Sequence, residues 1–368
     1  MQQIGASLRS QHVSRIYLVH GTFAGLDAGG LYGELARLIP GARRTLGGLQ
    51  KQLVDAIAGD HGNFTDAYAK HLASALNGHS SNGNIAATTH APIEVRLFNW
   101  SSENHHLGRA EAAVELLAEL LQSPPSATQR YLLIGHSHAG NVFALLTNLL
   151  SGDRERIDEF FEAASIHYRL PTFNVNDLPL WVDIATRLHD PQRTIDPALL
   201  DFVTFGTPIR YGWFKDGYGR LLHLISHRPR RDMPPFLAKF PPTIDEVLHG
   251  VGGDFIQQLG IAGTNTPPSL LAPRSWWADR RLHRVVQHNV PGDVFSRLAI
   301  GARVPDCGET LLVDYGELDA NILRHLAGHG LYTQESLMLF HWQQIATRLY
   351  PRRESNHKIL LPPGEGAL

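Results

Sequence analysis

The chain has 368 residues and carries 33 Lys and Arg against 35 Asp and Glu, a formal charge of −2. This balance creates no general attraction to polyanions, which argues against nucleic acid as the partner. No apolar run approaches the ~20 residues needed to span a bilayer, so we expect no integral membrane segment. The single cysteine, Cys307, excludes an intramolecular disulfide framework.

The N-terminal region lacks the basic stretch, apolar core and small-residue cleavage site of a signal peptide. The sequence therefore predicts a cytoplasmic protein, or one exported without a visible signal. Along the chain, short apolar runs alternate with helical patterns. The runs predict strands at 15–19, 93–100, 131–134, 201–205, 284–290 and 310–315, and the patterns predict helices at 109–122, 141–150 and about 334–349. This alternation is typical of a mostly parallel α/β sheet with helices on both faces.

Two segments are too long to be simple crossovers between strands. The segment 151–200 has a helical pattern. The segment 207–283 is rich in proline but also in aromatic residues, which indicates ordered structure. Its aromatic residues are Trp213, Phe214, Phe236, Phe240, Trp276 and Trp277. Because predicted strands occur from 15 to 315, we expect a single domain over 1–368, with a helical insertion at 151–200 and a cap or lid insertion at 207–283.

The strongest chemical signal is the run Gly135-His136-Ser137-His138-Ala139-Gly140, between a predicted strand and a predicted helix. A serine on a sharp strand-to-helix turn exposes its hydroxyl above the sheet, and the next backbone N–H can bind an oxyanion. Crowding in such a turn requires small residues two positions before and after the serine. Gly135 satisfies the first requirement, whereas Ala139 stands where the G-x-S-x-G pattern has glycine.

Two further elements stand at the ends of predicted strands: Leu18 to Phe23 (LVHGTF) and Phe205 to Arg210 (FGTPIR). With the serine turn, they make the sequence resemble the α/β-hydrolase superfamily, in particular lipase-like serine esterases with an HG-x oxyanion loop. The resemblance implies an α/β-hydrolase fold with a cap. It also implies an oxyanion hole made by the backbone N–H groups of Thr22 and His138, with Phe23 as the alternative to Thr22, and a structural role for His20 in its turn.

A serine nucleophile needs a base, and the base needs a carboxylate to orient it. In hydrolases of this type the chain order is serine, acid, histidine. Asp293 follows the predicted strand 284–290 through a Pro-Gly turn, which places it at the functional edge of a parallel sheet. The alternatives are Asp314, Asp306, Asp319 or a glutamate. For the base we expect His329, flanked by glycines on a loop where the family has its histidine, rather than His325 or His341.

We therefore expect a carboxylic-ester hydrolase that forms an acyl-enzyme through Ser137, His329 and Asp293. Phe23, Trp213 and Phe214 are expected substrate contacts, and the substrate is a small-molecule, lipid or polyester ester. No cofactor is needed for this chemistry. The pairs His136/His138 and His105/His106 lack a nearby third ligand in sequence, so we expect no metal. Two alternatives remain open, an acyltransferase with the same triad and a catalytically silent binding protein. The oligomeric state is not predicted.

Overall fold

The computed structural model describes residues 1–22, 63–78, 91–170, 175–176, 178–190, 195–231, 233–235, 237–238, 241–249, 252–261, 265–268, 272–286, 303–316, 318 and 325–351. Within these residues lies a six-stranded sheet in the order β2-β1-β3-β6-β7-β8, and every pair of neighbours is parallel. The strands are β1 (Val13–Val19), β2 (Glu94–Phe98), β3 (Arg130–His136), β6 (Leu200–Phe205), β7 (Arg220–Ser226) and β8 (Glu309–Val313).

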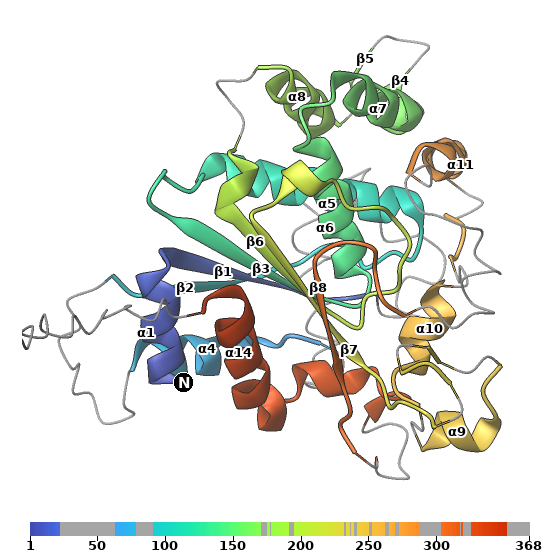
Figure 1. The fold of residues 1–368 in the computed structure, drawn as a ribbon. Helices are drawn as coiled ribbons and strands as arrows, with labels where there is room; N and C mark the ends of the chain where they lie inside the picture. Colours follow the sequence, from blue (N-terminus) through green and yellow to red (C-terminus); the bar gives the residue numbers. More distant parts are fainter. Residues whose placement is uncertain are drawn as a thin grey trace, which may run out of the picture.

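Helices cover the sheet on both faces (Figure 1). One face packs against α5 (His106–Gln122) and α6 (Ala139–Leu149), and the other against α1 (Gln2–Ser10), α4 (Asp66–Asn77) and α14 (Glu335–Leu349). Alternate residues of one strand serve opposite faces: in β1, Tyr17 and Val19 join the first core, while Ile16 and Leu18 join the second. The predicted α/β class with a parallel sheet is confirmed.

The late part of the sheet differs from the prediction. The predicted strand at 284–290 is wrong in its first residues, because α11 (Pro273–Val286) continues through Val286, and 287–290 lie outside the described residues. The strand that occupies this place in the sheet is β7, which lies inside the segment 207–283 that was predicted to be a cap. Its sequence, RLLHLIS, is rich in leucine and contains one β-branched residue, so its strand propensity is weak, and burial between β6 and β8 determines its structure.

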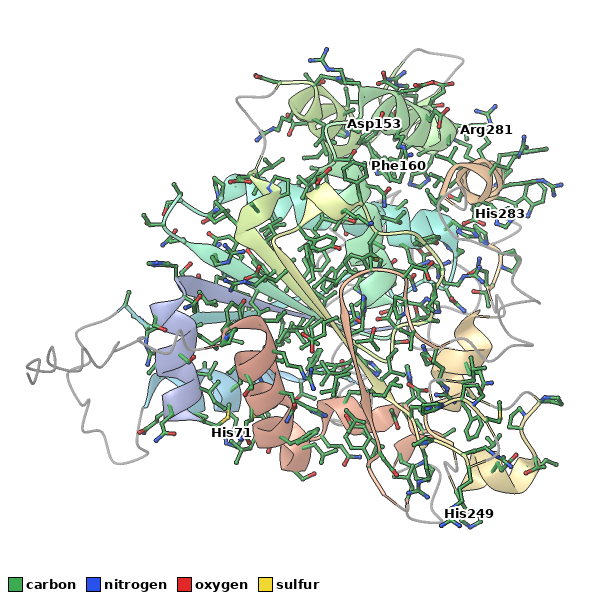
Figure 2. All side chains as sticks on the ribbon, in the orientation of Figure 1. His71, Asp153, Phe160, His249, Arg281 and His283 are labelled. Carbon is green, nitrogen blue, oxygen red and sulfur yellow. The ribbon has the colours of Figure 1, made fainter. Side chains whose placement is uncertain are left out.

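The two predicted insertions have different outcomes. The segment 151–200 contains the helices α7 (Arg154–Tyr168) and α8 (Pro179–Leu188), as predicted. Between them lies a short antiparallel pair of strands, β4 (Arg169–Leu170) and β5 (Val175–Asn176). Phe160 lies on the side of α7 that faces the body of the molecule (Figure 2) and stacks on Trp181 of α8. The segment 207–283 is not one insertion, because β7 divides it. After β7 come α9 (Ile244–Leu248), α10 (Phe255–Ile261) and α11, beyond the C-terminal ends of the strands in Figure 1.

Several of the 21 histidines are buried in the uncharged form. Burial lowers the pKa of His341 to about 3 and that of His223 to about 4. Burial, followed by the charges of Arg109 and Arg210, lowers the pKa of His106 to about 2. In the unfolded chain these side chains regain a pKa near 6.5 and bind protons below it.

We therefore expect acid lability. Each of these histidines contributes stability that is complete above pH 6.5 and is lost as the pH falls from 6.5 toward the folded-state pKa. The loss is about 1.4 kcal/mol per pH unit for each histidine. Urea unfolding of the wild type and of His341→Gln between pH 7 and 5 tests this, and the variant should show a shallower pH dependence by about one proton. Equal slopes in the two proteins would contradict the expectation.

Within the described residues, no helix is both long enough and apolar enough to cross a bilayer.

Candidate active site

Ser137 follows β3 directly and has a φ of 56°, in the left-handed region that non-glycine residues rarely adopt. Its N–H donates to the carbonyl of Phe205 at the end of β6 (2.8 Å), and its own carbonyl accepts from Thr207 Oγ1 (2.7 Å). Two neighbouring strand ends therefore hold the strained turn. Ser137 is 5% exposed and lies immediately before α6, the strand-turn-helix context that a nucleophilic serine requires.

The packing around the turn explains its departure from the G-x-S-x-G pattern. A Cβ at Gly135 would lie 2.6 Å from the Phe143 ring, so this position must be glycine. A Cβ at Gly140 would lie 2.2 Å from Thr207 Oγ1. The loop after β6 therefore makes the glycine necessary at 140, while Ala139 fits fully buried at the start of α6.

The end of β1 meets this turn. A Cβ on Gly21 would lie 2.6 Å from Ser137 Cβ and 3.3 Å from its Oγ, so only glycine permits this approach. Thr22 follows, and its Oγ1 is buried with no hydrogen-bond partner among the described residues. His20 accepts the Trp100 N–H at Nε2 (3.4 Å), while its carbonyl accepts from the Trp100 indole (2.8 Å). These contacts hold the turn, the role predicted for His20.

His329 is paired with a carboxylate that the sequence analysis did not name. Its Nδ1 lies 2.7 Å from Oδ2 of Asp254, which is fully buried after β7, and the N–H of Asp254 donates to the carbonyl of Ser226 at the end of that strand (3.0 Å). An ionised Asp254 accepts the Nδ1 proton, which leaves Nε2 of His329 as the basic nitrogen. Burial alone would raise the pKa of Asp254, but the charge and hydrogen bond of His329, the Gln257 N–H and Arg303 together lower it.

The loop that carries His329 is anchored to the segment that carries Asp254. Leu326, Ala327 and Gly328 have φ values of 46°, 52° and 88° in succession, and the Ala327 carbonyl accepts from Phe255 N (3.1 Å). His329 also reaches the serine turn, because its carbonyl lies 3.0 Å from Nε2 of His136, the residue before Ser137. The centroids of the His136 and His329 rings are 4.5 Å apart. His329 and the serine turn therefore lie at the same edge of the sheet.

Buried arginine side chains act on His138, the residue after Ser137. Burial, then the charges of Arg109 and Arg210, hold the pKa of His138 well below its usual range. Both arginines are buried. Arg109 donates to Tyr211 through Nε (2.8 Å), and its terminal nitrogens donate to the side-chain oxygens of Asn104 and Asn265. Because these three partners are neutral, none of them offsets the positive charge of Arg109.

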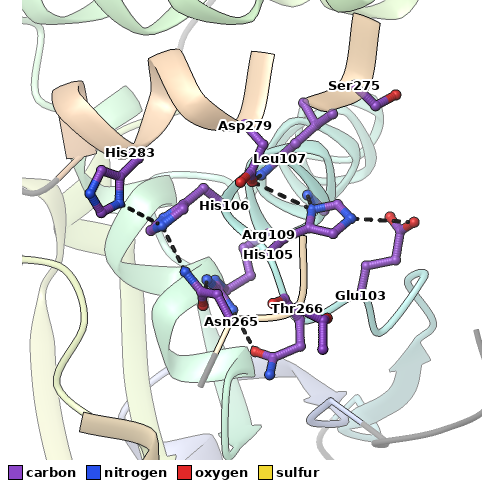
Figure 3. A network of polar contacts seen from close by, with 12 residues as sticks. Glu103, His105, His106, Leu107, Arg109, Asn265, Thr266, Ser275, Asp279 and His283 are labelled. Carbon is purple, nitrogen blue, oxygen red and sulfur yellow. Dashed lines mark hydrogen bonds and ion pairs between the residues drawn. The ribbon is translucent and has the colours of Figure 1, made fainter. Parts of the chain in front are cut away.

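Figure 3 shows this region continuing into the contact between α5 and α11. His106 Nε2 lies 3.0 Å from His283 Nδ1, and Asp279 Oδ1 accepts from the N–H of Leu107 (2.8 Å). Ser275 reaches His167 of α7 (3.4 Å). Ser275, Asp279 and His283 are spaced four residues apart and therefore share one face of α11. This polar face fastens α11 to α5 and α7.

The remaining sequence predictions have mixed outcomes. Phe23 and Asp293 lie outside the described residues, as does the alternative acid Asp319. Trp213 packs on Phe202 and His223 against the face of the sheet, and the N–H of Phe214 donates to Thr147 Oγ1 (3.3 Å). None of these contacts is with Ser137, His329 or Asp254.

The other candidates for the acid and base face elsewhere. Asp314 is exposed and pairs with Arg228 (3.1 Å). The Tyr315 hydroxyl and Nε2 of His341 form a hydrogen bond (2.7 Å), and His325 accepts from Gly328 N at the loop that precedes His329 (3.2 Å). Among the described side chains, no group of three or more His, Cys, Asp or Glu is arranged to hold a metal ion.

A sequence signal for Asp254 exists, although it is weak. Gly252 and Gly253 precede it with φ values of 100° and 107°, and Asp254 Oδ1 accepts from Gln257 N (2.8 Å), so it caps the start of α10. The run Gly-Gly-Asp before a helical pattern is therefore readable as a turn and cap. The weak strand propensity of β7 hides the strand end that precedes this aspartate in the chain.

Searches of protein-family models, of curated proteins and of solved structures gave no match for this chain.

Proposed function

We propose that the chain is a serine hydrolase of the α/β-hydrolase type that cleaves carboxylic esters. The observation that carries the proposal is the buried pair of His329 and Asp254 at the sheet edge where Ser137 sits in a strained turn. A positioned serine, a base with a free ring nitrogen and an orienting carboxylate are the components of nucleophilic acyl transfer. We assign the acid to Asp254 in place of Asp293, because Asp254 contacts the base.

In the proposed mechanism, Nε2 of His329 removes the proton from Ser137 Oγ as the oxygen attacks the ester carbonyl. The imidazolium that forms is stabilised through Nδ1 by Asp254 and then protonates the leaving alcohol. A water molecule, deprotonated by His329, attacks the acyl carbon, and the imidazolium then returns the proton to Ser137 Oγ as the C–Oγ bond breaks, which releases the carboxylic acid. These steps balance without a redox or metal centre.

The backbone N–H groups of Thr22 and His138 are the proposed oxyanion donors, because the first follows the Gly21 contact with Ser137 and the second begins the helix after it. The buried charges of Arg109 and Arg210 favour the same negative intermediate, since a positive potential in a buried site stabilises an oxyanion.

We infer that α10 and α11 belong to a cap over this site. Asp254 caps the start of α10, and α11 is fastened to α5 by the polar face described above. The cap would contribute walls to the ester pocket, while Trp213 belongs to the core of the sheet.

The proposal is tested by hydrolysis of a panel of p-nitrophenyl esters from acetate to palmitate. We expect turnover that saturates with substrate and a preference for one range of chain lengths, which would define the acyl pocket. The absence of hydrolysis across the panel by folded protein would contradict the proposal.

A further inference from the structure

The Tyr332 hydroxyl lies between the end of β7 and the proposed catalytic acid. The backbone N–H of Ser226 donates to this oxygen at 2.7 Å, and the oxygen lies 3.0 Å from Asp254 Oδ2. Because a backbone N–H can only donate, the phenol oxygen is an acceptor toward Ser226 and its own proton is directed to the carboxylate. The same Oδ2 accepts from Nδ1 of His329 at 2.7 Å.

The surroundings hold this hydroxyl in one position. Tyr332 is fully buried, its ring stacks on Phe205 (5.8 Å, 18°), and the Tyr315 ring meets it edge-on. Gly206 lies against the pair, since a Cβ there would be 2.5 Å from the Tyr332 ring and 2.6 Å from Asp254 Oδ2.

Ser226 is the common anchor of these groups. Its carbonyl accepts from Asp254 N (3.0 Å) and from Nη1 of Arg303 (3.1 Å), while its N–H holds Tyr332. Arg303 is fully buried and also donates to the Asp254 carbonyl (2.8 Å). The backbone and the carboxylate of Asp254 are thus fixed to the end of one strand through separate contacts.

We propose that Tyr332 is a positioning residue of the triad, which orients the Asp254 carboxylate and sets its basicity toward His329. The proposal rests on the proposed function. Burial and the charge of Asp254 hold the pKa of Tyr332 well above its usual range, so the phenol is a donor at every working pH. Its hydrogen bond takes up part of the negative charge on Oδ2 and thereby limits how strongly Asp254 stabilises protonated His329.

Removing the Tyr332 hydroxyl has two effects on Asp254: the carboxylate is less well oriented, and it keeps more of its negative charge. The carboxylate loses one of the donors that orient it, so the chemical step slows. The carboxylate also keeps more of its negative charge, so it attracts the imidazolium form of the base more strongly. Among the described residues, Arg303 and Tyr315 act on Asp254, and His136 and His138 act on or contact His329; the change replaces none of them.

The test compares Tyr332→Phe with Tyr350→Phe. Tyr350 is a matched control, because it is also buried and donates to a buried carboxylate, Asp201 Oδ2 (2.7 Å), but at the opposite end of the sheet. For Tyr332→Phe we expect kcat to fall about tenfold with little change in KM, the order contributed by a hydrogen bond to a charged group. The acid limb of the kcat/KM profile should move to higher pH by about 0.5 unit. Tyr350→Phe should lower the melting temperature and leave the profile unchanged.

A second measurement keeps the proposal testable if the phenylalanine variant folds poorly. In Tyr332→3-fluorotyrosine the phenol is a stronger donor, so the acid limb should move to lower pH. A folded Tyr332→Phe with wild-type kcat and pH profile, or a fluorotyrosine shift in the same direction as that of phenylalanine, overturns the inference alone. Esterase activity that survives Ser137→Ala overturns both the inference and the proposed function.

Discussion

Replacing Ser137 with alanine should reduce the hydrolysis of p-nitrophenyl esters by at least about 10⁴-fold, because loss of a serine nucleophile removes the acyl-enzyme route altogether. The change is expected to leave the fold intact, and relief of the left-handed backbone conformation is not expected, since alanine has the same constraint as serine there. The test compares initial rates of the wild type and the variant at saturating substrate, and a melting curve for each protein shows that it is folded.

Ser275→Ala is the matched control. Ser275 is buried and also lies beside a histidine that faces a carboxylate, with His167 Nδ1 at 3.4 Å and His167 Nε2 3.6 Å from Glu111. It sits inside α11 with no strained turn, and we expect its loss to leave the activity within about twofold, as for a change outside a reaction centre. If Ser275→Ala lost most of the esterase activity and Ser137→Ala lost little, the assignment of the nucleophile to Ser137 would be wrong.

The second large effect is expected for Asp254→Asn. The amide can donate to Nδ1 of His329 and so favour the tautomer that carries its proton on Nε2, where the base must be free. We expect kcat to fall about 10⁴-fold, with the remaining rate due to the oxyanion donors and binding. The measurement is a full kinetic comparison, with circular dichroism to show that the variant remains folded.

Asp293→Asn and Asp314→Asn accompany this experiment. Asp314 pairs with Arg228 at the surface, so its variant should retain activity. Asp293 was the acid predicted from the sequence, and because Asp254 holds the base we expect Asp293→Asn to be nearly as active as the wild type. The reverse ranking, in which Asp293→Asn is the more damaging, would restore the sequence prediction and remove Asp254 from the triad.

The parts of the site that the sequence predicts are those encoded in short contiguous motifs. The turn at Ser137 follows a strand and carries its own glycines, so strand, turn and helix are all readable locally. The glycine at position 21, at the end of β1, is also recognisable from the local sequence. The structure explains it, because a side chain there would collide with Ser137 Cβ. The loop position of His329 between glycines is likewise visible in sequence.

The acid was not predictable in this way, because its place depends on a strand with weak propensity. β7 is leucine-rich and is stabilised as a strand by pairing with β6 and β8, a tertiary effect that no local pattern encodes. Without it, the chain from Phe205 onward reads as one long cap, and the nearest strand-like run appeared at 284. That run begins inside α11, where its first residues continue an amphipathic helix. The position of β7 thus determines both the boundary of the proposed cap and the choice of the proposed acid.

The most direct test of the central claim is covalent labelling of the folded protein with a fluorophosphonate probe, followed by peptide mapping. We predict one label per chain on Ser137, strongly slowed labelling in Asp254→Asn, and no labelling after denaturation, since an unactivated serine hydroxyl does not react. Failure of the folded, ester-hydrolysing protein to take up the probe, or a label on a serine other than Ser137, would contradict the account.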